Sequence, residues 1–267
     1  MVFACPNPAS KANASQLAIS SKDQLMAADE ARDIATCGCS LMRLANTRFA
    51  SAGAHDPTPT PYFVLEELFG RFGLGPDSHV LDVGCGMGRA LAYYAEAGLP
   101  GRMTGIELDP ALAQFASSWS RDRPNLQVIC GDVLDLSLAP YSHFYLFNPF
   151  DTAVLLKFLA MLEAEAARPI TLAHMSDNGE TYFYIGRTGW SLVDEGAFQK
   201  YPPRHSANGQ ERTLLSRNAP KSATDKARLK ATAKDAAGTT CAQTPPKGRQ
   251  FNVYDHPQHY SIWRFEP

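Results

Sequence analysis

Residues 80–89 constrain the possible folds of this chain more strongly than any other segment. They form a short apolar run followed by three glycines at alternate positions, Gly84, Gly86 and Gly88, and a helix-like sequence begins at Arg89. Because glycine has no Cβ atom, such a strand–turn–helix junction lets a nucleotide-like ligand come close to the backbone. A dinucleotide fingerprint would need its third glycine at position 89. A nicotinamide-dependent oxidoreductase therefore stays a remote alternative.

Strand-like and helix-like segments alternate through the middle of the chain. This alternation predicts an α/β fold, in which a mostly parallel sheet is covered by helices on both faces and binds ligands beyond the carboxyl ends of its strands. Two later segments, 190–194 and 259–265, are predicted as the last, antiparallel strands. The other expected strands are 79–83, 103–106, 127–130, 143–147 and 170–174, and the expected helices are 90–97, 111–119 and 152–165.

Acidic residues follow two of the predicted strands. Glu107 ends the second strand, at about the 20-residue separation at which nucleotide-binding α/β folds place their ribose acid. Asp132 follows the third strand, where its carboxylate can accept from an adenine amino group while a backbone amide near Val133 reaches the ring. One acidic residue alone is common in the loop that follows a strand and indicates nothing. The order of glycine turn, acid and Gly-Asp pair is the evidence for a nucleotide-like ligand.

The fourth predicted strand ends in Asn148-Pro149-Phe150. An asparagine side-chain oxygen and nearby backbone carbonyls can accept hydrogen bonds from a nucleophilic amine, and an aromatic ring can flank a planar or cationic group. The same residues also suit an ordinary strand-ending turn with a phenylalanine in the core. Both interpretations stay open at this point.

These segments together resemble the class I S-adenosylmethionine (SAM) dependent methyltransferases. Asp82 precedes the first glycine by two residues, as in motif I of that family, and Asn148-Pro-Phe falls where its motif IV lies. Residues 57–69 resemble the entry segment and first helix of a subgroup with Asp-x-Gly-x-Gly-x-Gly-Arg and Asn-Pro-Phe motifs, which includes protein lysine methyltransferases. The single proline departs from the Asn/Asp-Pro-Pro-Tyr/Phe motif of exocyclic-amine methyltransferases, which argues against adenine or glutamine as substrate.

The resemblance implies a three-layer Rossmann-like sheet that binds SAM and releases S-adenosylhomocysteine (SAH). It implies that the glycine turn holds the methionine end of SAM, that Asp82 binds the amino group through water, and that the segment before the first helix lies over the methionine end. The cofactor contacts implied are Thr60, Tyr62, Asp82, Gly84, Cys85, Gly86, Gly88, Glu107, Leu108, Asp132 and Val133, and the catalytic residues are Asn148 and Tyr145.

The reaction expected from this resemblance is a direct in-line transfer of the methyl group to an amine, either a protein lysine or a small molecule. Such a transfer asks the protein mainly to align the nucleophile and to exclude water, so neither a metal nor a covalent residue is expected. A catalytically inactive SAM-binding protein would carry the same cofactor motifs and is the main alternative.

The chain divides by composition into four parts. Residues 1–55 are predicted as an appendage, partly helical over 16–35 or disordered, and residues 56–202 as the SAM-binding core. Residues 203–250 are predicted as a disordered insertion, and residues 251–267 as the strand that completes the core. Ten basic side chains lie between positions 204 and 249 against three acidic ones. This segment is expected to be either solvated chain or an arm that makes weak contact with a polyanion.

The remaining sequence features concern the cellular compartment in which the protein is expected. Six cysteines are scattered without a paired framework, which favours a reducing environment. No apolar run approaches the length of about 20 residues that spans a bilayer, and the first residues lack the basic start of a secretory signal. A cytoplasmic protein without a membrane partner is therefore expected.

Overall fold

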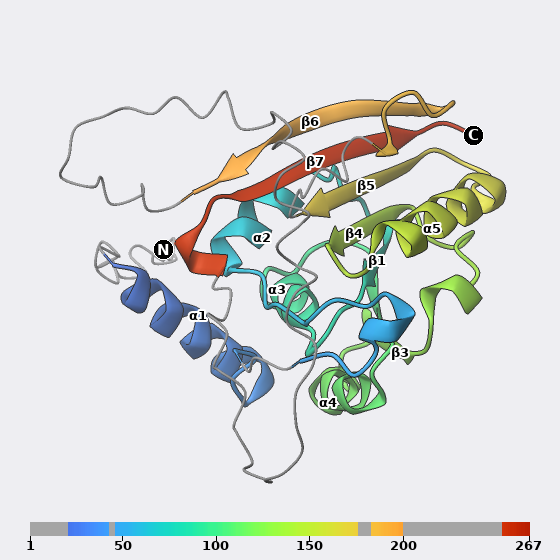
Figure 1. The fold of residues 1–267 in the computed structure, drawn as a ribbon. Coiled ribbons are helices and arrows are strands. Elements are labelled where there is room, and N and C mark those ends of the chain that lie inside the picture. The colour runs from blue at the N-terminus through green and yellow to red at the C-terminus, as the bar shows by residue number, and fades with distance from the viewer. Residues whose placement is uncertain (1–20, 43–45, 176–182, 200–252) are drawn as a thin grey trace, which may run out of the picture. The chain divides into compact units, whose positions relative to one another are not determined.

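The computed structural model describes residues 21–42, 46–175, 183–199 and 253–267 (Figure 1). The described residues form a seven-stranded sheet in the order β3-β2-β1-β4-β5-β7-β6, in which β7 is antiparallel to both of its neighbours and the other strands share one direction. The strands are β1 His79–Val83, β2 Arg102–Glu107, β3 Leu126–Cys130, β4 His143–Phe147, β5 Ile170–Met175, β6 Trp190–Phe198 and β7 Gln258–Phe265. The predicted α/β class with an antiparallel C-terminal strand is confirmed.

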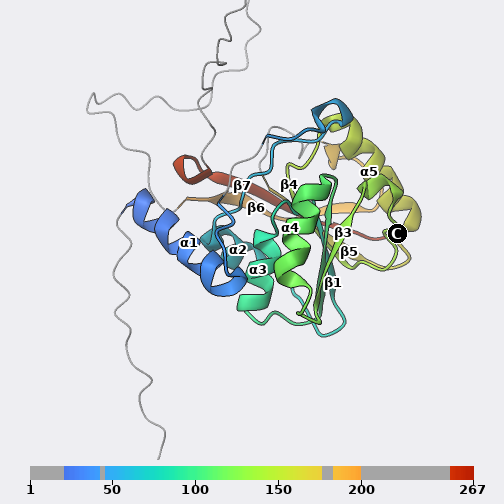
Figure 2. The same cartoon turned by 90° about the horizontal axis from the view of Figure 1, so that it is seen from below.

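Helices cover both faces of this sheet, which makes three layers. The α-helices are α1 Lys22–Cys37, α2 Tyr62–Phe69, α3 Arg89–Glu96, α4 Pro110–Ser120 and α5 Thr152–Glu165, and the 3-10 helices are η1 Ala50–Ala52, η2 Val133–Asp135 and η5 Val253–Asp255. Apolar side chains of α2 and α3 pack in one core with Trp119 of α4, and those of α5 pack in a second core. Figure 2 shows α2 and α3 on one side of the strands and α5 on the other.

Local sequence signals explain where the elements begin. Asp109 caps α4 by accepting from the amide of Ala111, and Pro110 takes the first helical position, where its missing N–H is not needed. Asp151 caps α5 in the same way through Val154. β1 is buried along its whole length, as expected for a central strand of a parallel sheet that is covered on both faces.

The N-terminal helix α1 differs in position from its prediction. It runs from Lys22 to Cys37 instead of 16–35, because Ser21 caps its first turn and Gly38 ends it in a left-handed conformation. Residues 1–20 lie outside the described residues. Strand β6 is also longer than predicted, and its register with β7 shifts between Leu192 and Asp194.

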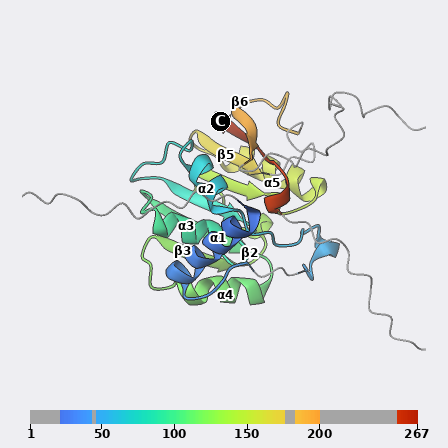
Figure 3. The same ribbon diagram turned by 90° about the vertical axis from the view of Figure 1, so that its left-hand side faces the viewer.

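A buried polar cluster attaches α1 to the rest of the fold. Asp33 accepts hydrogen bonds from the hydroxyl of Tyr62 and from the guanidinium of Arg89, and it is fully buried. Asp29 accepts from the backbone amide of Tyr62 and from the hydroxyl of Tyr254, which also accepts from Arg89. Figure 3 shows α1 in front of α3. The appendage predicted for the first part of the chain is therefore bonded to three separate elements, α2, α3 and η5.

All described residues belong to one compact unit, drawn from residues 1–202 and 252–267. The predicted basic insertion at 203–250, including its expected polyanion contact over 204–249, lies outside the described residues. Within the part that is described, we find no helix that combines the length and the apolar character needed to cross a membrane.

Candidate active site

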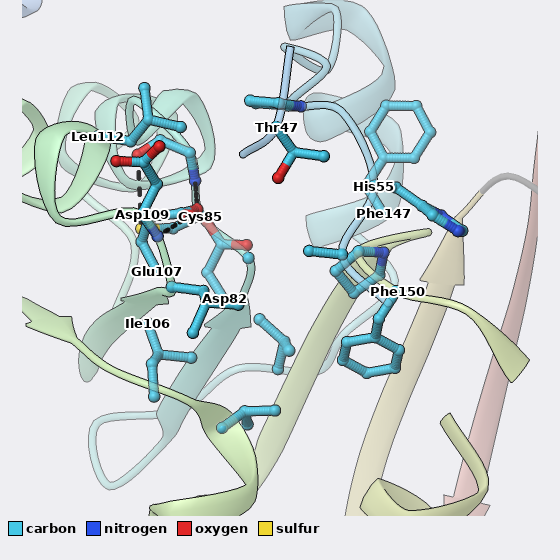
Figure 4. A pocket seen from close by; sticks show the side chains of 18 of the residues that line it. Thr47, His55, Asp82, Cys85, Ile106, Glu107, Asp109, Leu112, Phe147 and Phe150 are labelled. Atoms are coloured by element: carbon cyan, nitrogen blue, oxygen red, sulfur yellow. Dashed lines mark hydrogen bonds between the residues drawn. The ribbon is translucent and has the colours of Figure 1, made fainter. Parts of the chain in front are cut away.

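A cavity opens beyond the carboxyl ends of β1 to β4, where the topology predicts a ligand site. Figure 4 shows its acidic residues Asp82, Glu107 and Asp109 on one side and His55, Phe147 and Phe150 on the other. The cavity brings together eleven of the predicted site residues: Thr60, Asp82, Gly84, Cys85, Gly86, Glu107, Leu108, Asp132, Val133, Tyr145 and Asn148.

The glycine turn is held against β2 by backbone hydrogen bonds. The amides of Gly84 and Cys85 both donate to the carbonyl of Ile106, at 2.9 and 3.0 Å. Gly84 has a φ of 74°, and a Cβ at this position would lie 2.8 Å from Cβ of Pro149. Only glycine suits this backbone and this close approach of the turn after β4. The turn therefore brings the ends of β1, β2 and β4 together.

Glu107 at the end of β2 connects the two loops beside it. One carboxylate oxygen accepts from the amide of Gly86 and the other from the amide of Asp109, both at 2.8 Å. Burial raises the pKa of Glu107, although these backbone amides oppose the shift. A carboxylate has about four lone-pair sites, so each oxygen keeps capacity to accept one more hydrogen bond from a ligand.

Asp82 in β1 presents a buried carboxyl group to the same cavity. Burial and the nearby charge of Glu107 raise its pKa to about 8. Within the described part of the chain, no hydrogen bond or ion pair compensates this carboxyl group. A buried carboxylate is costly without a partner, so this side chain can accept a cationic group of a ligand. The thiol of Cys85, whose pKa burial raises well above its ordinary value, stays protonated beside it.

The adenine-side residues predicted after β3 lie together at the start of η2. Asp132 caps this 3-10 helix, because its Oδ1 accepts from the amide of Leu134 at 2.9 Å. Val133 is buried and lines the cavity beside it. The backbone of Gly131 donates to the carbonyl of Glu107, at 3.0 Å, which fixes this loop next to the end of β2.

Asn148 follows β4 in a conformation that is unusual for its residue type. Its φ of 42° is positive, which among the described residues occurs otherwise only at glycines. Its Oδ1 atom is buried and has no hydrogen-bond partner within the described residues. Such strained positions with unsatisfied polar atoms occur often at functional sites. Tyr145, three residues earlier in β4, bonds through its hydroxyl to the hydroxyl of Thr60 at 2.6 Å.

A segment that sequence reasoning largely missed completes the cavity wall. Residues 47–60, here called the strap, contribute ten of the lining residues. Arg48 binds both carboxylate oxygens of Asp109, at 3.1 and 2.7 Å, and this ion pair lowers the pKa of Asp109. His55 donates to the main chain after β4, and Ala54 pairs with Phe150 as an isolated β-bridge. Within the strap, only the Pro-Thr segment at its end matched a sequence motif. Arg48 and His55 matched none.

Two predicted cofactor contacts do not line the cavity. The side chain of Tyr62 is fully buried and turns toward α1, because its hydroxyl donates to Asp33 and the guanidinium of Arg32 covers its ring. Gly88 instead precedes α3 as its N-cap with a φ of 89°, and a Cβ there would lie 2.8 Å from the ring of Trp119. Both residues shape the fold around the cavity, and neither reaches into it.

Comparisons with known proteins find one family match and several similar folds. Residues 80–171 match the family described as "Methyltransferase domain", and a search of curated proteins gives no match. The structure is similar to a putative methyltransferase of Escherichia coli, with 18% identity and a TM-score of 0.48 over 79% of this chain and 90% of that one. It is also similar to an RNA methyltransferase of Salinibacter ruber in complex with SAH, with 20% identity and a TM-score of 0.42 over 51% of this chain and 86% of that one. The family match covers the glycine turn and the three strand ends that follow it, so residues 80–171 match a methyltransferase domain, and SAM-dependent methyl transfer is the activity that these findings support.

Proposed function

We propose that this methyltransferase transfers the methyl group of SAM to the nitrogen of an amine, on a protein lysine or a small molecule. The observation that supports an amine is the buried Oδ1 of Asn148, which lacks a hydrogen-bond donor among the described residues. A buried acceptor without a partner costs about 1–3 kcal/mol. An N–H group of the acceptor amine supplies the missing donor and is thereby oriented for attack.

The cavity residues suggest how SAM is held. In this proposal the exposed backbone of the glycine turn receives the methionine end, and Asp82 binds the amino group through water. The remaining acceptor capacity of Glu107 suits the two ribose hydroxyls. Asp132 accepts from the adenine amino group, and a backbone amide near Val133 reaches the ring. SAM supplies the activated methyl group, and the chain supplies alignment and exclusion of water.

The far wall of the cavity has the composition expected for an amine acceptor. Phe147 is half-buried at the end of β4, and Phe150 is 8% exposed in the turn that follows. They lie across the cavity from the acids of the cofactor side (Figure 4). The face of an aromatic ring attracts a cation by about 0.5–2 kcal/mol. A protonated amine that enters between these walls would gain this attraction before it reaches Asn148.

Cofactor binding tests the first half of this proposal. We expect micromolar SAH binding in calorimetry and at least a tenfold loss in Glu107→Ala, because the ribose loses its acceptor and the glycine turn loses its tie to β2. Glu67→Ala is the matched control, since this exposed glutamate of α2 lies outside the cavity. Equal SAH affinities of wild type and Glu107→Ala would contradict the assignment.

Methyl transfer tests the second half. Tritiated SAM is incubated with the protein and either poly-L-lysine, acetylated poly-L-lysine or n-butylamine. We expect label in the unmodified amines that survives alkaline hydrolysis, as N-methyl groups do. Asn148→Gly should bind SAH normally and lose transfer, because glycine tolerates the positive φ but has no amide oxygen. Label that alkali removes, as from methyl esters, would refute the amine acceptor.

A further inference from the structure

An amine acceptor requires a group that removes its proton, and the inference below rests on the proposed function. A lysine side chain has an ordinary pKa of about 10.4, so at pH 7 fewer than about one in a thousand carries the lone pair that attacks a methyl group. The cavity lining offers several side chains as proton acceptors. Their hydrogen bonds, protonation and positions decide which of them can act as the base.

The ionisable groups nearest to the cofactor side are engaged or protonated. Both oxygens of Glu107 accept backbone amides, and Asp109 is paired with Arg48, which lowers its pKa. Burial raises the pKa of Tyr145, so its hydroxyl keeps its proton and cannot act as a base at neutral pH. Asp82 lies on the opposite wall from His55 (Figure 4). None of these groups combines a vacant lone pair with a place beside Asn148.

His55 of the strap has both properties. Its Nδ1 lies 2.9 Å from the backbone oxygen of Asn148, and its own amide donates to the carbonyl of Pro149 at 3.0 Å. A carbonyl oxygen only accepts, so Nδ1 carries the hydrogen. A neutral imidazole has a single N–H group, which leaves the lone pair on Nε2. In the described part of the chain no group bonds to Nε2, and His55 lines the cavity.

We propose that His55 is the general base of the reaction, and that it acts on the same nitrogen that Asn148 orients. Nε2 takes one proton from the acceptor ammonium, whose N–H electron pair stays on nitrogen. The imidazolium that forms still donates through Nδ1 to the carbonyl of Asn148, which stabilises its charge. Because His55 is exposed, the imidazolium returns its proton to solvent afterwards.

The transfer itself then balances without any further reagent. The amine lone pair attacks the methyl carbon, and the new C–N bond forms as the C–S bond breaks. The electron pair of the C–S bond stays on sulfur, so the positive charge moves from the sulfonium to the product nitrogen. The products are SAH and an N-methylammonium group. Over a full cycle, one proton of the acceptor leaves through His55.

The tautomer of His55 is the most direct test. In the full-length protein with 15N-labelled histidine and bound SAH, the His55 resonances are assigned by their loss in His55→Gln. We expect Nδ1 to be protonated and Nε2 to carry the lone pair, and n-butylamine to perturb the Nε2 resonance. An Nε2-protonated ring, or a ring that does not respond to the amine, would overturn the role of His55. Neither result bears on amine methylation by the wild type, which the tritium assay measures separately.

Kinetics of the same variant provide a second test. General-base catalysis contributes typically 10²–10⁴-fold, so kcat of His55→Gln toward the amine acceptor should fall by that order while SAH affinity stays within about twofold. The residual rate should rise with pH, because the amine then loses its proton to solvent. His259→Gln, an exposed position on β7, is the matched control and should behave as wild type. An unchanged kcat and pH profile in His55→Gln would refute the proposal.

Discussion

The buried carboxyl group of Asp82 makes cofactor affinity depend on pH. Its pKa of about 8 without ligand means that it is mostly protonated at pH 6 and half ionised at pH 8. The ammonium group of SAH attracts the ionised form, so binding releases a proton. Affinity therefore rises with pH, by about tenfold for each pH unit well below 8, and levels off above that value.

The size of the effect follows from the ionised fraction. With a pKa of about 8, about 1% of Asp82 is ionised at pH 6 and about 50% at pH 8. The SAH dissociation constant should thus fall by about 50-fold between these two pH values, which corresponds to about 2.3 kcal/mol. Burial raises the pKa of Glu107 as well, and the thiol of Cys85 stays neutral throughout.

Calorimetry with SAH at pH 6, 7 and 8 measures this dependence, and buffers with different heats of ionisation count the protons released. Close to one proton should leave on binding at pH 7. Asp82→Asn should bind more weakly at pH 8 and lose most of the pH dependence, while Asp77→Asn, an exposed position in the turn before β1, should keep the wild-type slope. The reasoning fails if wild-type affinity is constant over this range, or if Asp82→Asn retains the full slope.

Three further predictions concern stability and turn geometry. Asp82→Asn should raise the free energy of unfolding of the unliganded protein at pH 8 by at least about 1.4 kcal/mol in urea and leave it unchanged at pH 4. The reason is that folding raises the pKa of Asp82, so the wild type loses stability as the pH rises toward 8. Asp33→Ala should cost about 3–5 kcal/mol in the same assay, since it leaves a buried arginine without its carboxylate; a smaller loss would show that water reaches the cluster. Gly84→Ala should abolish SAH binding through its positive φ and its contact with Pro149. Gly38→Ala, which has a similar φ but open space around it, should cost only about 1–2 kcal/mol and leave binding intact.

The parts of the fold that could be predicted are those governed by local signals. Strand β1, strand β4 and helix α5 have the predicted bounds, because buried apolar runs, glycines and caps lie close together in sequence. The cavity likewise collects the residues that follow successive strands, since parallel strands end at one edge. Glu107, Asp132 and Asn148 were predictable for this reason alone.

The parts that could not be predicted depend on contacts between distant segments. Asp29 and Asp33 have the sequence of a solvated helix face, yet both are buried, because an arginine and two tyrosines from other elements meet them. Tyr62 was expected at the cofactor and turns to this cluster instead. Arg48 and His55 have partners more than sixty and ninety residues away, so no local pattern marks them.

The interior position of β7 has a consequence for the order in which the protein folds during synthesis. β7 lies between β5 and β6, although residues 258–265, which form it, are made after both of these strands. While the ribosome still holds these residues, β5 has no partner on one side, and β6 has none among the described strands. Until β7 emerges, the nascent chain therefore carries two strand edges that can pair with other chains.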